Sequence, residues 1–459
     1  MTNATIFVVI ALLGLFAFVA VRQRSVALVS GATDQLHSLP RYHGYYAAVV
    51  VSLPSLLVLL LWVTTGKLIV ENLILSGLPQ ETVAANAERI DLLINRIRLV
   101  AENGSAIETD ETILSAATRF NSLYQQGVAA TLALAVGIAA AGYFYATNKV
   151  GRKFRARARY EQVLLVLLAV SSFVAIGITI GIVASLIFES LRFFQQVPIA
   201  EFVFGLKWSP QTALRVDQIA AEGSFGAVPL FAGTFLISFV AMCVAGPIGL
   251  LSAIYLTQYA GPALRGFAKP LLEILAGIPT VVYGFFAALT VAPMLRNHGA
   301  VFGLDVASES ALAAGLVMGI MIIPFVSSLS DDAITAVPDS MKQGSLALGA
   351  TPAETIARVI IPAALPGIIS SFLLAISRAV GETMIVVMAA GMRPNLTANP
   401  LEAVTTVTVQ IVALLTGDQE FNSAKTLSAF ALGLALFLTT LVFNIFALRL
   451  VRRYRQVYE

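Results

Sequence analysis

Long apolar stretches dominate this sequence and limit what the chain can fold into. Nine of them reach the roughly 20 residues that a helix needs to cross the hydrocarbon layer of a membrane. Because a segment in lipid must satisfy its backbone polar groups internally, each stretch predicts a transmembrane helix. Together the stretches predict an all-α integral membrane protein. A shorter run, 403–416, indicates an interfacial or re-entrant segment. The nine stretches lie at about residues 4–21, 46–65, 127–146, 162–188, 231–255, 271–295, 311–330, 366–390 and 426–449.

Composition excludes several other classes. Charged residues make up only 12% of the 459 residues, against about a quarter in a soluble domain. The net charge of +3 does not indicate a nucleic-acid partner. The single cysteine, Cys243, excludes an intramolecular disulfide and a thiolate metal cluster, and the three histidines are scattered, so we expect no metal and no cofactor.

Basic residues in the short loops predict the orientation. Segment 149–159 holds six basic residues and no acidic one, and the C-terminal tail is also basic, so both are expected in the cytoplasm. Nine spans then place the N-terminus in the periplasm and the C-terminus in the cytoplasm, with segment 66–126 outside. The residues concerned are Lys149, Arg152, Lys153, Arg155, Arg157 and Arg159, the tail residues Arg449, Arg452, Arg453 and Arg455, and the outside acids Glu81, Glu88, Asp91, Glu102, Glu108, Asp110 and Glu111.

The outside segment 66–126 mixes apolar and charged residues at helical spacing, which predicts a small helical domain. It could be a docking surface for a periplasmic partner or a solvated excursion without a role of its own. We place a domain boundary at the basic linker that follows. Residues 1–160 then form an N-terminal extension with three spans, and residues 161–459 form a six-span domain.

The cytoplasmic loop 331–365 contains two helix starts in succession. Pro338 opens the first helix, and Gly349 suits its left-handed C-terminal cap. Thr351, Pro352 and Glu354 form a capping box with proline at the first helical position. Pro362 is expected to end the second helix. Asp331 and Asp332 open the loop and could meet basic residues of a partner or remain solvated.

The spacing in this loop resembles the EAA loop of bacterial ABC importer permeases, in which Glu-Ala-Ala is followed by a glycine and later by Ile-x-Leu-Pro. Glutamine replaces the glutamate, glycine and serine replace the alanines, and isoleucine replaces the leucine. The matching residues are Gln343, Gly344, Ser345, Gly349, Val359, Ile361 and Pro362.

Two further motifs are similar to those of permease subunits of phosphate-specific ABC importers. The sixth stretch contains the run from Leu271 to Phe286 with Gly277, Pro279 and Gly284, where a bend or close helix approach is expected. The eighth contains Arg378-Ala379-Val380-Gly381-Glu382-Thr383-Met384. The resemblance covers about 162–455. It implies a bacterial inner-membrane permease that pairs with a homologous permease, two copies of an ATPase and a periplasmic phosphate-binding protein.

Arg378 is the residue most in need of a partner. It lies 12 residues after Pro366, roughly 18 Å into a helix and therefore near the middle of the bilayer. A charge there costs at least about 2.5 kcal/mol unless it is paired or faces water. On a continuous helix Glu382 would share its face. We expect Arg378, with Glu382 and Thr383, either to line a path for an anion or to form a structural ion pair.

No phosphate-binding loop of the form Gly-x-x-x-x-Gly-Lys-Ser/Thr occurs, so ATP hydrolysis is expected in another chain. The work expected here is alternating access without covalent chemistry, and the chain is not expected to be an enzyme. Three alternatives remain open: a permease for molybdate or sulfate, a membrane sensor with segment 66–126 as its ligand domain, and a secondary transporter, which the absence of an evident internal repeat disfavours.

Overall fold

The computed structural model describes residues 2–30, 33–78, 90–103, 110–210, 223–416 and 423–454. Within these ranges eight helices are long and apolar enough to cross a membrane, and a ninth crossing results if one bent helix pair is counted as a span. The predicted all-α membrane fold is confirmed. Glu81, Glu88, Glu108 and Arg455, which entered the prediction of orientation, lie outside the described residues. The chain divides into two compact units, Met1–Ile176 and Gly177–Glu459.

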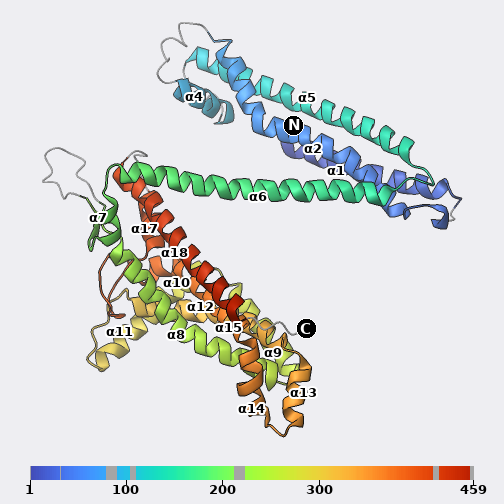
Figure 1. Cartoon of the computed structure of the whole chain (residues 1–459). Helices are drawn as coiled ribbons and strands as arrows, with labels where there is room; N and C mark the ends of the chain where they lie inside the picture. Colours follow the sequence, from blue (N-terminus) through green and yellow to red (C-terminus); the bar gives the residue numbers. More distant parts are fainter. Residues whose placement is uncertain are drawn as a thin grey trace. The chain divides into compact units, whose positions relative to one another are not determined.

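The first unit is built on three long helices that lie side by side (Figure 1). They are α1 (Asn3–Ala27), α2 (Pro40–Leu75) and α5 (Glu111–Lys149), with the short η1 (Thr33–Gln35) between the first two. Small and aliphatic residues such as Ile10, Ala47 and Ala135 are fully buried between them. The buried Ser55 hydroxyl lies 3.0 Å from the carbonyl oxygen of Ala135, which ties α2 to α5.

The helices α2 and α5 are longer than a membrane is thick. With 36 and 39 residues, they extend about 54 and 58 Å against a hydrocarbon layer of about 30 Å. Their projecting ends bury an apolar cluster with α4 (Ile90–Asn103). The described part of segment 66–126 is therefore helical, as the spacing of its apolar residues predicts, and consists mainly of α4 and the adjoining ends of α2 and α5. The cluster contains Val70, Ile74, Leu93, Ile97, Val100, Ile113, Ala116, Ala117 and Phe120.

Helix α6 (Ala156–Phe194) begins in the first unit and ends in the second, which contains all later elements. These elements are α7 (Ile199–Phe204), β1 (Trp208–Ser209), β2 (Ser224–Phe225), α8 (Val228–Gln258), α9 (Pro262–Ala276), α10 (Thr280–Phe286), the π-helical η4 (Ala287–Val291), α11 (Ala292–Val301), α12 (Ala311–Thr335), α13 (Asp339–Ala347), α14 (Pro352–Thr355), the π-helical η5 (Ile356–Ile360), α15 (Ile361–Val380), α16 (Met384–Ala389), α17 (Val407–Leu415) and α18 (Ala424–Tyr454).

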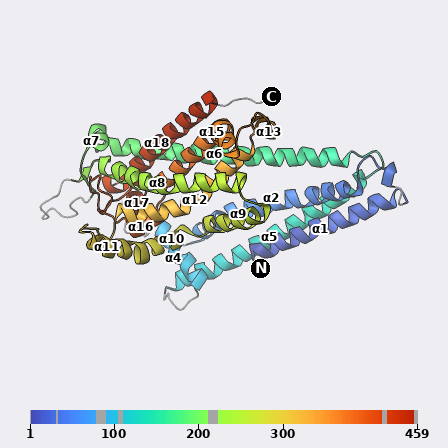
Figure 2. The same ribbon diagram turned by 90° about the horizontal axis from the view of Figure 1, so that it is seen from below.

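The core of the second unit lies around α12, which packs along α8 (Figure 2). Met318, Ile322 and Val326 of α12 are fully buried there. A β-carbon at Gly315 or Gly319 would collide with Val240 or with Val244 on α8. Glycine at these positions therefore lets the two backbones approach closely, as small residues do in membrane helix pairs.

Candidate functional site

The sixth predicted span is broken. α9 ends at Ala276, α10 begins at Thr280, and the two helices are bent by 87°. Gly277 follows the last residue of α9, and Pro279 precedes α10. The Tyr283 hydroxyl donates a hydrogen bond of 2.8 Å to the Leu275 carbonyl across the break. The bend expected from Gly277 and Pro279 is confirmed, and a straight span over 271–295 is wrong.

The eighth predicted span is also interrupted. α15 ends at Val380, and the six-residue α16 begins at Met384. One carboxylate oxygen of Glu382 accepts from the backbone N–H groups of Thr383 at 3.1 Å, Met384 at 3.0 Å and Ile385 at 3.4 Å. Glu382 thus satisfies the amide groups at the start of α16, which have no partner within the helix.

The expected ion pair between Arg378 and Glu382 is absent from the structure. Residues four apart share a helical face only while the helix continues, and α15 stops between these two residues. Glu382 is engaged by backbone amides instead. The Arg378 side chain is exposed on α15, and its guanidinium carbon lies 5.8 Å from the centre of the Phe325 ring on α12. Among the residues that the structure describes, no carboxylate lies within 4.0 Å of it.

The two breaks lie close together because α10 packs against α16. A β-carbon at Gly284 would meet the Met388 sulfur at 2.6 Å and the Met384 carbonyl oxygen at 3.2 Å. Tyr283 and Ile385 are buried in the same core cluster. The motif of the sixth span and that of the eighth, about 100 residues apart in the sequence, therefore form one locus, with Thr383 half-buried at its edge.

The loop 331–365 forms the two helix starts that its sequence predicts. α13 has no buried residue, and Gln343 and Gly344 are exposed on it. Gly349 follows with φ +86°, a left-handed conformation that suits glycine. Thr351 and Glu354 make both hydrogen bonds of a capping box at α14. The hydroxyls of Ser345 and Thr355 lie 2.9 Å apart and join the two helices.

Pro362 does not end the second helix, contrary to expectation. α14 continues through the π-helical η5 into α15, so the second helix of the loop and the eighth span form one continuous element. Proline lacks an N–H, and its ring clashes with the carbonyl group four residues earlier. The carbonyl group four residues before Pro362 belongs to Arg358, which lies in the wider π-helical turn of η5, and the helix continues past the proline.

A buried acidic residue connects α12 to α9 below this loop. The side chain of Asp331 is only 6% exposed, and its carboxylate lies 2.8 Å from Lys269 and 3.2 Å from Arg265. Asp332, by contrast, is 68% exposed and 3.9 Å from Lys269. Asp331 is therefore an internal ion-pair partner, and its suggested contact with another subunit is wrong. Its environment depends on a helix more than 60 residues away, which local sequence cannot reveal.

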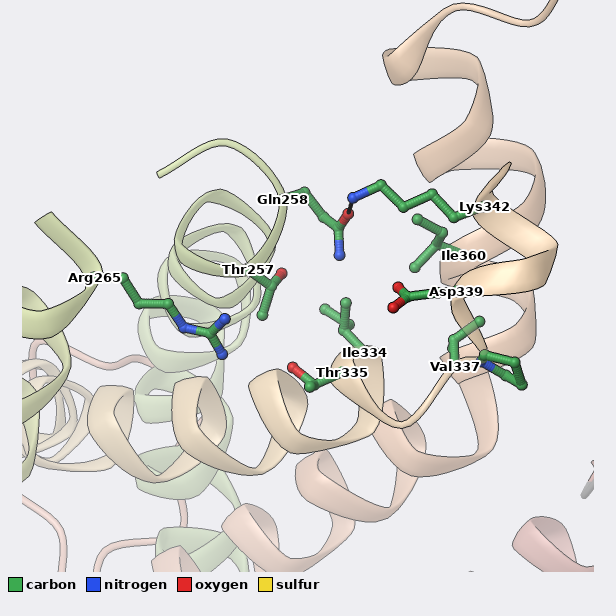
Figure 3. Close-up of a pocket in the computed structure, with 10 residues that line it drawn as sticks. Thr257, Gln258, Arg265, Ile334, Thr335, Val337, Asp339, Lys342 and Ile360 are labelled. Carbon is green, nitrogen blue, oxygen red and sulfur yellow. Dashed lines mark hydrogen bonds between the residues drawn. The ribbon is translucent and has the colours of Figure 1, made fainter. Parts of the chain in front are cut away.

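A cavity of about 160 Å³ lies beside this network, at the base of α13 (Figure 3). Lys342 of α13 donates a hydrogen bond of 3.0 Å to the side-chain oxygen of Gln258 at the end of α8. Arg265 lines another side of the cavity and Asp339 faces it from α13. The hydrogen bond of Lys342 links α13 to the end of α8.

Two family descriptions match the chain. Residues 7–178 match "Phosphate ATP-binding cassette transporter", and residues 245–456 match "Binding-protein-dependent transport system inner membrane component". A bacterial ABC transporter for import of the acidic polysaccharide alginate is a similar solved structure, with a TM-score of 0.45 and 14% identity over 65% of this chain and 99% of that one.

Two relatives agree with the second family. The probable ABC transporter permease protein YqgH of Bacillus subtilis is 30% identical over 279 residues, which are 60% of this chain and 84% of that protein. The phosphate transport system permease protein PstC of Pasteurella multocida is 31% identical over 296 residues, 59% of this chain and 86% of that protein. With its broken spans and its two-helix loop, the chain belongs to the inner-membrane permease family of binding-protein-dependent ABC transport systems, which includes the PstC permeases.

Proposed function

We propose that this chain is a transmembrane permease subunit of an ATP-driven importer of inorganic phosphate and forms half of its translocation path. The proposal rests on the guanidinium of Arg378, which is exposed and without an ion pair among the residues that the structure describes. Its guanidinium is permanently charged, exposed on this subunit and without a carboxylate partner in the described part of the chain. Exposure to lipid would cost at least about 2.5 kcal/mol. A water-filled path shared with a second permease avoids that cost, and the planar fork of arginine fits phosphate oxygens bidentately.

The breaks next to Arg378 support a path at this position. Backbone that leaves the helical conformation at membrane depth is tolerated where it is buried in protein or lines a water-filled cavity. Transporters use such discontinuous helices to build substrate sites. In this proposal Arg378 meets the anion, Glu382 holds the start of α16 in place, and Thr383 lies beside the path.

The loop after α12 is the proposed contact with the ATPase. The exposed pair of α13 and α14 forms a rigid projection, closed by Gly349 and by the capping box. Its continuity with α15 provides a mechanical connection from the ATPase to the break beside Arg378. The residues proposed to form or shape this contact are Gln343, Gly344, Ser345, Gly349, Thr351, Glu354 and Pro362.

The remaining assignments complete the proposed assembly. A PstA-like permease would supply the other half of the path, a PstB-like ATPase dimer would hydrolyse ATP, and a PstS-like periplasmic protein would deliver phosphate. Residues 1–160 would be an extension, with 66–126 in the periplasm, and residues 161–459 the permease domain. The N-terminus would lie in the periplasm and the C-terminus in the cytoplasm, as the basic loops predict.

Uptake of labelled phosphate by the assembled complex in proteoliposomes tests this function. We expect Arg378→Gln to reduce uptake at least about tenfold, and Arg378→Lys to keep a minor part of the activity because lysine carries the charge without the fork. Arg296→Gln is the matched control, since Arg296 is exposed on α11 and its side chain binds Ser308 at 3.1 Å.

Competition by other oxyanions completes the experiment. A hundredfold excess of unlabelled sulfate or molybdate should leave uptake of labelled phosphate unchanged, whereas unlabelled phosphate should suppress it. Near-normal uptake by Arg378→Gln would assign this arginine to structure. Uptake of sulfate or molybdate in place of phosphate would refute the proposed substrate.

A further inference from the structure

A buried polar contact joins the strand pair of the second unit to α17. The strands β1 and β2 pair antiparallel, with Trp208 opposite Phe225. The Trp208 indole N–H donates a hydrogen bond of 3.0 Å to the side-chain oxygen of Gln410 on α17. Both residues are buried, with 3% of Trp208 and 7% of Gln410 exposed. The Gln410 amide nitrogen in turn lies 3.3 Å from the Met392 carbonyl oxygen and 3.3 Å from the Thr405 hydroxyl.

The same short helix reaches the break beside Arg378. The hydroxyl of Thr408 donates a hydrogen bond of 2.9 Å to the backbone carbonyl of Glu382. It also lies 3.0 Å from the hydroxyl of Thr406, which accepts from the Val409 N–H at the start of α17. Glu382 is therefore held on two sides, by Thr408 at its carbonyl and by the amides of α16 at its carboxylate.

These contacts are specific for one arrangement of the break. A buried polar group without a partner costs about 1–3 kcal/mol, whereas a satisfied bond adds only about 1 kcal/mol to stability. The Trp208 indole and the Glu382 carbonyl keep these partners only when the strand pair, α17 and the break hold their present positions. A shift of α17 would leave several buried groups unpaired at once, so the polar series selects a geometry more than it adds stability.

We infer that Thr408 and Gln410 are positioning residues for anion transfer at Arg378. Thr408 holds the break between α15 and α16, and Gln410 couples α17 to the strand pair through Trp208. In the proposed orientation the strand pair lies at the periplasmic side, where the binding protein would deliver phosphate. The series thus connects the docking side to the break. This inference rests on the proposed function.

The complete complex in proteoliposomes, with its binding protein and ATPase, tests the inference. The measured quantity is the number of phosphate ions imported per ATP hydrolysed, together with the KM and the maximal rate of uptake. This ratio does not depend on the amount of assembled complex. Thr408→Val removes the hydroxyl at nearly constant volume, Thr408→Ser restores it, and Gln410→Leu removes the contacts to Trp208, Met392 and Thr405.

Thr439→Val is the matched control. The Thr439 hydroxyl donates a hydrogen bond of 2.8 Å to the Ala435 carbonyl of its own helix, α18, and has no other hydrogen-bond partner among the residues that the structure describes. We expect Thr408→Val to lower the ratio roughly fivefold, the factor that corresponds to one hydrogen bond of about 1 kcal/mol. Gln410→Leu removes three contacts and should lower the ratio at least as much. The KM for phosphate should not change, because the binding protein captures the ion. Thr408→Ser and Thr439→Val should match the unmodified protein.

An unchanged ratio in Thr408→Val and Gln410→Leu would overturn the inference, whether or not less complex assembles. Failure of Thr408→Ser to restore the ratio would also overturn it, since the hydroxyl is the group in question. These results differ from failure of the proposed function. That function fails if the unmodified complex imports no phosphate or if Arg378→Gln is near normal, whereas the inference alone fails if Arg378→Gln is defective and the Thr408 variants are not.

Discussion

Replacement of Gly349 tests how much one turn contributes to the proposed coupling between the ATPase and phosphate transport. Gly349 joins α13 to α14 with φ +86°. In the described part of the chain, no atom beyond its two sequence neighbours lies within 4 Å of the position that a β-carbon would occupy. A side chain there meets no steric obstacle, so its cost comes from the backbone alone. A left-handed conformation costs an ordinary residue about 1–2 kcal/mol, and a β-branched residue the upper end or more.

The magnitude follows from these values. We expect Gly349→Ala to cost about 1 kcal/mol and Gly349→Val about 2 kcal/mol, with Gly349→Asn below both because asparagine tolerates this conformation. A cost of about 2 kcal/mol lowers the ratio of loops in the docking geometry to distorted loops roughly 30-fold. ATP-driven phosphate uptake and co-purification of the ATPase should fall in the order Asn, Ala, Val.

Gly344 supplies the control in the same loop. It is also exposed, and no described residue outside its own helical turn lies within 4 Å of a β-carbon position, but it lies inside α13 without a positive φ. Alanine there improves helix propensity by up to about 1 kcal/mol, and the EAA pattern itself has alanine at this place. Gly344 belongs to the proposed contact, but alanine is the residue that the EAA pattern has at this place, so Gly344→Ala should not lower uptake as Gly349→Val does. Full uptake by Gly349→Val, or equal defects in Gly344→Ala and Gly349→Val, would refute the reasoning.

Two further predictions concern the ion pairs and the orientation. Asp331→Asn should lower the thermal unfolding temperature in detergent. The expected loss in the free energy of unfolding is only about 1–2 kcal/mol, because the partners Lys269 and Arg265 are more than one third exposed. Asp332→Asn, at a side chain that is 68% exposed, should not change it, and equal effects would contradict the assignment of Asp331. In a background without the exposed Cys243, a cysteine at Thr118 should react with an impermeant maleimide from the periplasm and one at Arg155 should not. The reverse pattern would invert the proposed orientation.

Local chemistry made several elements of this fold predictable from the sequence. The apolar stretches predict membrane helices because each helix satisfies its own backbone, independently of its neighbours. Thr351 and Glu354 predict a helix start because their hydrogen bonds close within four residues. The left-handed turn at Gly349 and the bend near Pro279 were predictable for the same reason, since the backbone conformations open to glycine and proline depend on the residue itself.

The tertiary structure decided the contacts that depend on distant segments. A continuous eighth span predicts that Arg378 and Glu382 pair, but α15 ends between them, and the break is stabilised by Thr408 of a later helix. Asp331 is an internal partner only because α9 brings Lys269 and Arg265 beside it. Hydrogen bonds and ion pairs act over a few ångströms, while the residues that make them are separated here by 26 to 66 positions. Only the packing of the helices brings such groups within reach of each other.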